Sequence, residues 1–122
     1  MNNKPKLKID GNGNKRWYLP NGKLHREDGP AIEWADGYKE WYRNGNLHRE
    51  DGPAVEYANG TKSWYRNGNL HREDGPAVER ADGSKEWYLN GKQYTEEEWM
   101  LHTLRNVDPE TRKAYKDILN NI

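Results

Sequence analysis

Hydrophobic positions along this chain recur as evenly spaced aromatic pairs rather than as long apolar runs. Four Trp-Tyr pairs, separated by 24, 23 and 23 residues, begin at Trp17, Trp41, Trp64 and Trp87. Residues 41–56 read WYRNGNLHREDGPAVE, and residues 64–79 repeat them letter for letter. A fixed period of this size indicates stacked supersecondary units rather than a single globular core.

The first half of each repeat predicts a β-hairpin. Asn59-Gly60 lies between two runs of strand-forming residues, which favours a two-residue type I′ turn. That loop places Val55 opposite Trp64, a β-branched residue against an aromatic one. The same register pairs Ile32 with Trp41 and Val78 with Trp87.

The second half of each repeat predicts a shorter hairpin. Its Asn-Gly turn, at 67–68, pairs Leu70 with Tyr65 and His71 with Trp64. The sequence Glu-Asp-Gly-Pro that follows is typical of a turn. Each repeat therefore forms two or three short antiparallel strands, and the array is an elongated, twisted meander.

Helical signals replace this pattern near the C-terminus. Thr95 and Glu98 form a capping box, and Asp-Pro at 108–109 marks a second helix start. We expect helices at about 96–106 and 109–121. An apolar stripe on the second comprises Ala114, Tyr115, Ile118, Leu119 and Ile122. The helices are expected to cover the open sheet edge; the alternative is that the final helix docks a partner or a second copy.

The predicted fold is mainly β with a C-terminal α segment: an elongated antiparallel β-hairpin repeat array capped by two short helices. Its parts are a basic lead or first edge at 1–16, repeats at 17–93 (17–40, 41–63, 64–86 and a partial 87–93), and a helical cap at 94–122. The lead carries Lys4, Lys6, Lys8, Lys15 and Arg16. A solvated flexible tail is the preferred interpretation of this lead, ahead of a nucleic-acid contact.

Composition alone borders on the disordered range, because Leu, Ile and Val supply 16 of 122 residues and 33% of residues are charged. However, the net charge is zero, and six Trp and eight Tyr occupy periodic positions. These large rings favour a folded domain in which indoles and phenols of successive repeats form one continuous spine.

Charge and cysteine content narrow the function classes. Balanced charge argues against a dedicated nucleic-acid binder, and the absence of cysteine excludes disulfides and thiolate metal sites. Residues 1–10 lack the apolar run of a signal peptide, and no segment is apolar enough to span a membrane. We therefore expect a cytoplasmic protein, in the bacterial host if it is phage-encoded.

The repeats resemble the MORN repeat family and, more closely, its divergent bacterial and viral relatives. The resemblance rests on the period, on Tyr65 followed by Asn-Gly at 67–68, on His71, and on Ala-Asn-Gly-Thr-Lys at 58–62. It covers residues 17 to about 93. The chain departs from the family pattern in having Arg-Glu-Asp-Gly-Pro-Ala after the histidine and no glycine before the aromatic pair.

This resemblance implies stacked β-hairpins that bind proteins and, in some members, membrane phospholipid. Arrays with the pattern WYxNGxxHRxDGPA and a following helix are similar to uncharacterised proteins of phages and large viruses. Some bacterial relatives resemble antitoxins. The resemblance names no partner.

His25, His48 and His71 share one column of the repeat, which raises the question of a metal ladder. Equivalent residues two or three strands apart are ~10–14 Å apart, whereas zinc ligand atoms lie within ~2.0–2.3 Å of the ion. Packing of each histidine on the adjacent tryptophan is favoured instead. We predict no metal and no cofactor.

Catalysis requires unlike groups that converge in one pocket. Here the sequence His-Arg-Glu-Asp recurs along an extended surface, and its Arg and Glu residues are interpreted as ion pairs between repeats. We predict no catalytic residues and no enzymatic activity.

Candidate binding residues are sought where otherwise identical copies differ. The variable columns read Trp34, Tyr57, Arg80; Tyr38, Thr61, Ser84; and Glu40, Ser63, Glu86. Aromatic residues and arginine dominate interface energetics, so Trp34, Tyr38, Tyr57 and Arg80 form the predicted partner surface. The alternative is cation–π packing of Trp34 and Tyr57 on Lys39 and Lys62.

The favoured function is a non-enzymatic protein–protein interaction module, encoded by a phage or bacterium, that binds a partner protein, with inhibition as one outcome. The alternatives are a carbohydrate- or choline-binding array and a phospholipid-surface binder. Nucleic acid and membrane are not expected partners. A homo-oligomer formed through the sheet edge or the C-terminal helix is a further alternative.

Overall fold

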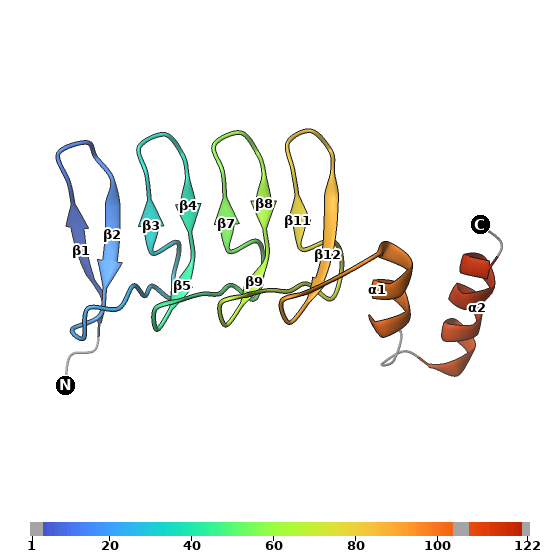
Figure 1. Cartoon of the computed structure of the whole chain (residues 1–122). Helices are drawn as coiled ribbons and strands as arrows, with labels where there is room; N and C mark the ends of the chain where they lie inside the picture. The colour runs from blue at the N-terminus through green and yellow to red at the C-terminus, as the bar shows by residue number, and fades with distance from the viewer. Residues whose placement is uncertain (1–3, 104–107, 121–122) are drawn as a thin grey trace.

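The computed structural model describes residues 4–103 and 108–120. Four β-hairpins stand side by side in one antiparallel sheet, and the two helices follow at its C-terminal end (Figure 1). In spatial order the sheet contains β1 (Lys6–Ile9), β2 (Lys15–Tyr18), β3 (Ile32–Glu33), β4 (Lys39–Glu40), β7 (Val55–Glu56), β8 (Lys62–Ser63), β11 (Val78–Glu79), β12 (Lys85–Leu89) and β13 (Lys92–Tyr94). The predicted antiparallel hairpin architecture with C-terminal helices is confirmed.

Two small hairpins hang below the main sheet. They pair β5 (Tyr42–Arg43) with β6 (Asn46–Leu47), and β9 (Tyr65–Arg66) with β10 (Asn69–Leu70). Asn67 and Gly68 both have positive φ, as the predicted type I′ turn requires. The predicted pairing of Leu70 with Tyr65 is confirmed, and the His71 N–H donates to the Trp64 carbonyl.

The register predicted for the upper hairpins is wrong by one residue. Val55 pairs with Ser63 rather than Trp64. The Tyr57 N–H donates to the Thr61 carbonyl, so the loop has three residues and only its glycine has positive φ. This is a turn followed by a G1 bulge. Ile32 and Val78 likewise pair with Glu40 and Glu86, not with Trp41 and Trp87.

The corrected register gives the main sheet two different faces, because residues directly opposite one another share a face. One face carries an alternating row of Lys15, Glu33, Lys39, Glu56, Lys62, Glu79 and Lys85. We call it the ladder face. The other face carries Arg16, Ile32, Glu40, Val55, Ser63, Val78 and Glu86. We call it the aromatic face, because Trp34, Tyr38 and Tyr57 extend it toward the hairpin tips.

The buried positions are small aliphatic residues and histidines rather than stacked aromatic rings. Ala31, Ala54 and Ala77 are fully buried, and Ile32, Val55, Val78 and the three repeat histidines are nearly so. The Trp-Tyr pairs are only half-buried. Among the described residues, direct ring contacts are confined to Trp34–Tyr38–Tyr57 and Tyr94–His102. The predicted continuous aromatic spine is therefore wrong.

In the described part of the basic lead, residues 6–9 form a strand, so this part is the predicted first edge rather than a flexible tail. β1 pairs with β2 over four residues, and Lys8 lies 5.2 Å from the ring centroid of Tyr18. β1 is the terminal strand of the sheet, and no other described strand pairs with its outer side (Figure 1). Lysine on such an edge opposes pairing with another edge.

Helix α1 (Glu96–Thr103) closes the other end of the sheet. Thr95 and Glu98 exchange the two hydrogen bonds of a capping box, both 3.2 Å. The Trp99 side chain is buried, and its indole N–H donates to the Arg72 carbonyl at 2.9 Å. α1 packs on β12 and β13, which supports its predicted role as an edge cover.

Helix α2 (Pro109–Asn120) starts at the predicted cap, where the Thr111 N–H donates to the Asp108 carboxylate. Ile118, in the predicted apolar stripe, is exposed. Ile122, the side chains of Tyr115 and Leu119, and the predicted helix residues 104–106 and 121 lie outside the described part of the chain.

Candidate functional site

Three of the four predicted partner residues form one cluster on the aromatic face. The Tyr38 ring lies 4.9 Å from the Trp34 ring and 5.2 Å from the Tyr57 ring, in an edge-on arrangement with the latter. The cluster joins two successive hairpins. Trp34 and Tyr57 retain 42% and 45% of their surface for solvent, so this is an exposed aromatic platform.

The packing alternative for these aromatics is wrong. Trp34 pairs with Tyr38 through a backbone hydrogen bond, and Glu33 stands opposite Lys39. Lys39 and Lys62 lie on the ladder face, away from the platform. The exposed rings are thus free of the lysine contact that would have made them structural.

A carboxylate anchors the platform from below. The Tyr38 hydroxyl donates to Glu40 Oε1, and the Tyr42 hydroxyl donates to Oε2 at 2.8 Å. Burial of each phenol, together with its hydrogen bond to Glu40 and the charge of that carboxylate, raises the pKa of both tyrosines. The neutral phenols therefore belong to the folded state.

Tyr38 and Tyr42 are expected to ionise only at strongly alkaline pH and together with unfolding. A phenol whose pKa is raised on folding contributes stability that is complete below its unfolded pKa of about 10. This stability is lost as pH rises through the folded pKa. Phenolate absorbance and circular dichroism, followed together through an alkaline titration, should show a late, cooperative group of tyrosines. In Glu40→Gln that group should ionise earlier; unchanged titration would contradict the role of the carboxylate.

Arg80, the fourth predicted residue, lies one repeat further along the same face. Its Nη2 donates to both oxygens of Glu86, at 3.0 and 3.2 Å. Arg80 is exposed, and it lines a hollow with Tyr57. The structure therefore places all four predicted residues on one face, with Arg80 as a charged neighbour of the ring cluster.

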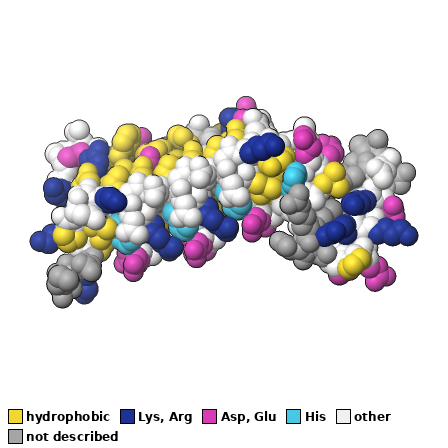
Figure 2. Space-filling view, turned by 60° about the horizontal axis from the view of Figure 1, so that its bottom comes forward, with side chains coloured by type: hydrophobic (Ala, Val, Ile, Leu, Met, Phe, Trp, Pro, Cys, Tyr) yellow, Lys and Arg dark blue, Asp and Glu magenta, His cyan; other side chains and the backbone are white. Residues whose placement is uncertain are grey.

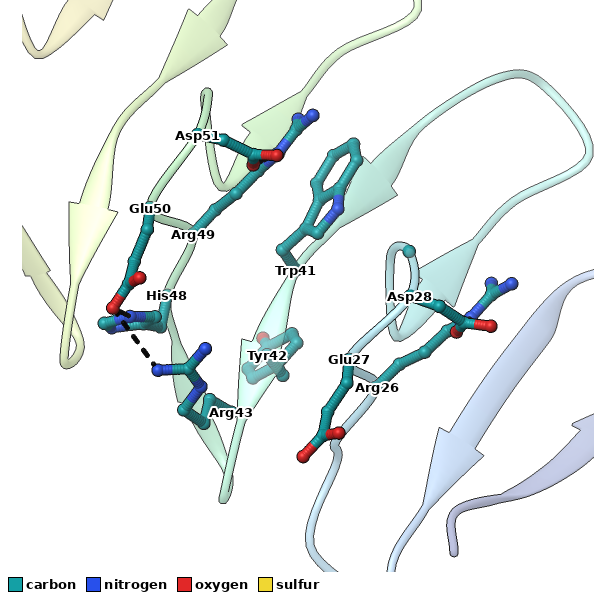
Figure 3. Close-up of a pocket in the computed structure, with 11 residues that line it drawn as sticks. Arg26, Glu27, Asp28, Trp41, Tyr42, Arg43, His48, Arg49, Glu50 and Asp51 are labelled. Carbon is teal, nitrogen blue, oxygen red and sulfur yellow. Dashed lines mark hydrogen bonds and ion pairs between the residues drawn. The ribbon is translucent and has the colours of Figure 1, made fainter.

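The opposite face carries a repeated stack of arginine on tryptophan that the sequence reasoning missed. The guanidinium carbons of Arg26, Arg49 and Arg72 lie 3.8, 3.9 and 3.8 Å from the ring centroids of Trp17, Trp41 and Trp64. Figure 3 shows two of these arginines with the carboxylates that hold them. The recurring spacing from tryptophan to arginine was the available signal.

Each stacked arginine also organises its own loop. Arg72 Nε donates to Asp74 at 2.8 Å, and its Nη1 donates to the Pro76 carbonyl and to Glu79 at 3.0 and 3.1 Å. These partners lie within one repeat. The predicted role of the arginines as links between repeats is therefore wrong.

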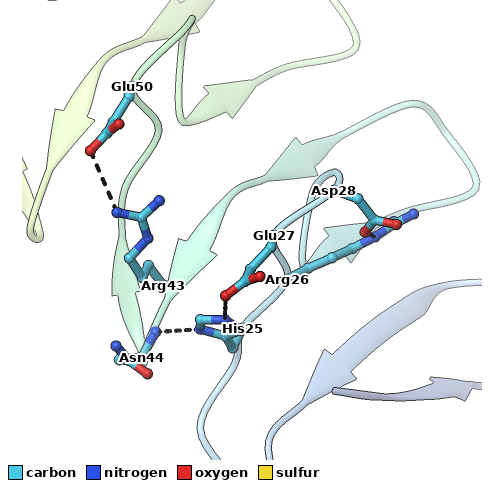
Figure 4. Close-up of polar contacts among 7 residues, drawn as sticks. All are labelled: His25, Arg26, Glu27, Asp28, Arg43, Asn44 and Glu50. Carbon is cyan, nitrogen blue, oxygen red and sulfur yellow. Dashed lines mark hydrogen bonds and ion pairs between the residues drawn. The ribbon is translucent and has the colours of Figure 1, made fainter. Parts of the chain in front are cut away.

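The histidine column supplies side-chain hydrogen bonds from one repeat to the next. His25 Nδ1 accepts a hydrogen bond from the Asn44 N–H at 2.9 Å, and its Nε2 lies 3.4 Å from Glu27 (Figure 4). His48 and His71 bind the next turns in the same way, at Asn67 and Asn90. The prediction that these histidines pack on tryptophan rings missed this role, because donor and acceptor lie 19 residues apart.

Grooves of about 520 and 560 Å³ separate successive His-Arg-Glu-Asp loops. Figure 3 shows the first, in which Arg43 pairs with Glu50 at 3.5 Å. Charges of both signs line these grooves, and their arginines are already held by the loop carboxylates. Within residues 4–103 and 108–120, no three histidine, cysteine or acidic residues form a cluster that could hold a metal ion.

The two sides of the array differ at the surface. Hydrophobic side chains gather along the upper rim in Figure 2, whereas histidines recur at regular intervals below them, with acidic side chains beneath.

No described helix is long and apolar enough to cross a membrane. The chain matches no protein-family model, no curated protein and no solved structure.

Proposed function

We propose that the chain is a MORN-like, non-enzymatic interaction module of a phage or bacterium that acts in the cytoplasm. Its aromatic face binds a partner protein, and inhibition of that partner is one outcome of binding. The proposal is carried by the platform of Trp34, Tyr38 and Tyr57, in which half-exposed rings pack on each other and leave one side to solvent.

Protein partners fit this platform better than other ligands do. Large, rigid aromatic residues with an arginine nearby make up the usual energetic centre of protein interfaces. The Tyr38–Glu40–Tyr42 hydrogen bonds fix the central ring before binding, which lowers the entropy lost on association. A phospholipid surface would need a basic patch, whereas Arg80 is neutralised by Glu86.

Differences between the repeats suggest substitutions that test this proposal and should leave the fold intact. Arg80 occupies in the third full copy the position of Trp34 and Tyr57, so the double substitution Trp34→Arg and Tyr57→Arg uses a residue already accepted by this frame. A photo-crosslinking residue placed at Asp36, at the hairpin tip, should capture a protein from bacterial lysate at one-to-one stoichiometry. The double variant should reduce capture by at least about tenfold.

The matched control is Lys39→Ser with Lys62→Ser, two exposed substitutions on the ladder face. Capture should be unchanged in this control. Equal capture by the wild type and the Arg double variant would reject the platform as the binding surface. Retention of the wild type on choline or glycan resin, without any protein partner, would instead favour the carbohydrate- or choline-binding alternative.

A further inference from the structure

The second full repeat carries, at its boundary with the third, a hollow of about 570 Å³ on the aromatic face. It lies where the repeat loses bulk, because Thr61 and Ser63 occupy the columns that hold Tyr38 and Glu40 in the preceding copy. The lining comprises Tyr57, Asn59, Thr61, Ser63, Tyr65, Leu70, Val78, Arg80, Glu86 and Tyr88. The hollow thus has an aliphatic floor and phenol walls beside the exposed platform.

The Ser63 side chain lines this hollow. Ser63 is only 8% exposed, and among the described residues its side chain makes no hydrogen bond. The neighbouring hydroxyl, that of Thr61, already accepts a hydrogen bond from the Ala81 N–H at 3.1 Å. The Ser63 hydroxyl is therefore available to a ligand that enters the hollow.

The preceding copy shows what fills the equivalent space. There the Tyr38 ring lies between the column-mates Trp34 and Tyr57, and its hydroxyl donates to Glu40 below. Around Thr61, in the second copy, the flanking residues are Tyr57 and Arg80, and Ser63 stands in place of Glu40. The hollow therefore has the surroundings of a tyrosine side chain, but the chain supplies threonine.

The charges of the hollow favour a neutral occupant. Arg80 and Glu86 neutralise each other through two hydrogen bonds from one guanidinium nitrogen. Burial and the neighbouring phenols and Glu40 raise the pKa of Tyr65, which keeps that wall uncharged. A cationic ligand would be repelled by Arg80, and an anionic ligand would be repelled by Glu86. A neutral aromatic ring with a hydroxyl satisfies both the apolar walls and Ser63.

We propose that this hollow receives a tyrosine side chain of the partner protein, with its ring between Tyr57 and Arg80 and its hydroxyl hydrogen-bonded to Ser63. This inference rests on the proposed function and specifies the partner's anchor residue. The partner then completes in the second repeat the arrangement that Tyr38 makes within the first. Aromatic anchors carry much of the affinity of protein interfaces.

The test uses the full-length chain and a small probe rather than the partner. N-acetyl-tyrosine amide, titrated into isotope-labelled protein, should shift the amide signals of Ser63, Tyr65 and Val78 saturably at about millimolar concentration. N-acetyl-phenylalanine amide, which lacks the hydroxyl, should bind at least about threefold more weakly. Thr61→Tyr with Ser63→Glu copies the first repeat into the second and should abolish both shifts, whereas Thr61→Ser keeps the hollow and should bind normally.

Ser63→Ala provides a second route should the double variant not fold, since it removes only the hydroxyl. It should erase the preference for the tyrosine probe. Equal binding of the two probes by the wild type, shifts spread over the whole array, or saturation by a sugar but not by the phenol would each overturn the proposal. These probe titrations contain no partner protein. Their failure would therefore not affect the capture experiment with Trp34→Arg and Tyr57→Arg, which tests the platform separately.

Discussion

Trp64→Ala is expected to lower the free energy of unfolding by about 3 kcal/mol, near the lower end for large aromatic residues because Trp64 is half-buried. The change removes the surface on which the Arg72 guanidinium lies, 3.8 Å from the ring centroid. That arginine is only 19% exposed and holds Asp74 and Glu79. Without the indole, the loop loses its packing and its cation–π contact together.

Urea denaturation of Trp64→Ala should be compared with that of Trp34→Ala. Both variants lose the same atoms, but Trp34 is 42% exposed, and its ring packs on the Tyr38 ring of the platform. We expect less than about 1 kcal/mol for Trp34→Ala. Equal losses in the two variants would show that the arginine stack contributes nothing beyond ordinary surface burial.

The loop glycine beside this stack has a steric role. A Cβ atom on Gly75 would come within 2.8 Å of the Arg72 guanidinium carbon. The guanidinium is therefore held between the indole on one side and the glycine on the other. Gly75, in Asp-Gly-Pro, therefore allows the close approach of arginine because it lacks a side chain. A positive φ is not the reason for glycine at this position, since Gly75 does not have one.

Local signals in the sequence were sufficient for the elements. The period, the lower Asn-Gly turns and the capping box at Thr95 and Glu98 all predicted what the structure contains. The variable columns likewise located Trp34, Tyr38 and Tyr57, which do form one cluster. Differences between near-identical copies were informative because the shared frame is already explained by folding.

The upper register could not be read from the dipeptide alone. Asn-Gly closes a two-residue turn at 44–45 and a three-residue loop at 58–60 within a single repeat. In the longer loop the Asn59 side chain accepts the Thr61 N–H at 2.9 Å, which stabilises an Asx turn instead of a left-handed asparagine. This one-residue difference moves every side chain of a strand to the other face.

The contacts between repeats were also beyond the local pattern. The histidine acceptors and their asparagine donors lie 19 residues apart, and the stacked arginines bind both a tryptophan and a loop. Buried alanines and histidines therefore occupy the core of the array, where an aromatic spine was expected. In a repeat array such contacts decide whether the units melt together, because stability is the sum of unit and interface terms.

His48→Ala is expected to lower stability by about 2 kcal/mol and to broaden the unfolding transition. The His48 side chain is buried, and its Nδ1 accepts the Asn67 N–H at 3.0 Å across the central interface of the array. Alanine leaves a cavity and an unpaired donor there. Backbone hydrogen bonds remain across the interface, from Gly68 to Leu47, from Arg49 to Tyr65 and in the pairing of β8 with β11, so the coupling is weakened rather than abolished.

His48→Asn separates the hydrogen bond from the packing. The asparagine oxygen can take the place of Nδ1 as acceptor, so this variant should retain about half of the stability lost in His48→Ala. His102→Ala is the control, because His102 contacts Tyr94 in the cap and makes no bond between repeats. Hydrogen exchange of the Asn67 amide should rise in His48→Ala alone. Protection of that amide in all three variants would mean that the backbone bonds couple the repeats without the histidine.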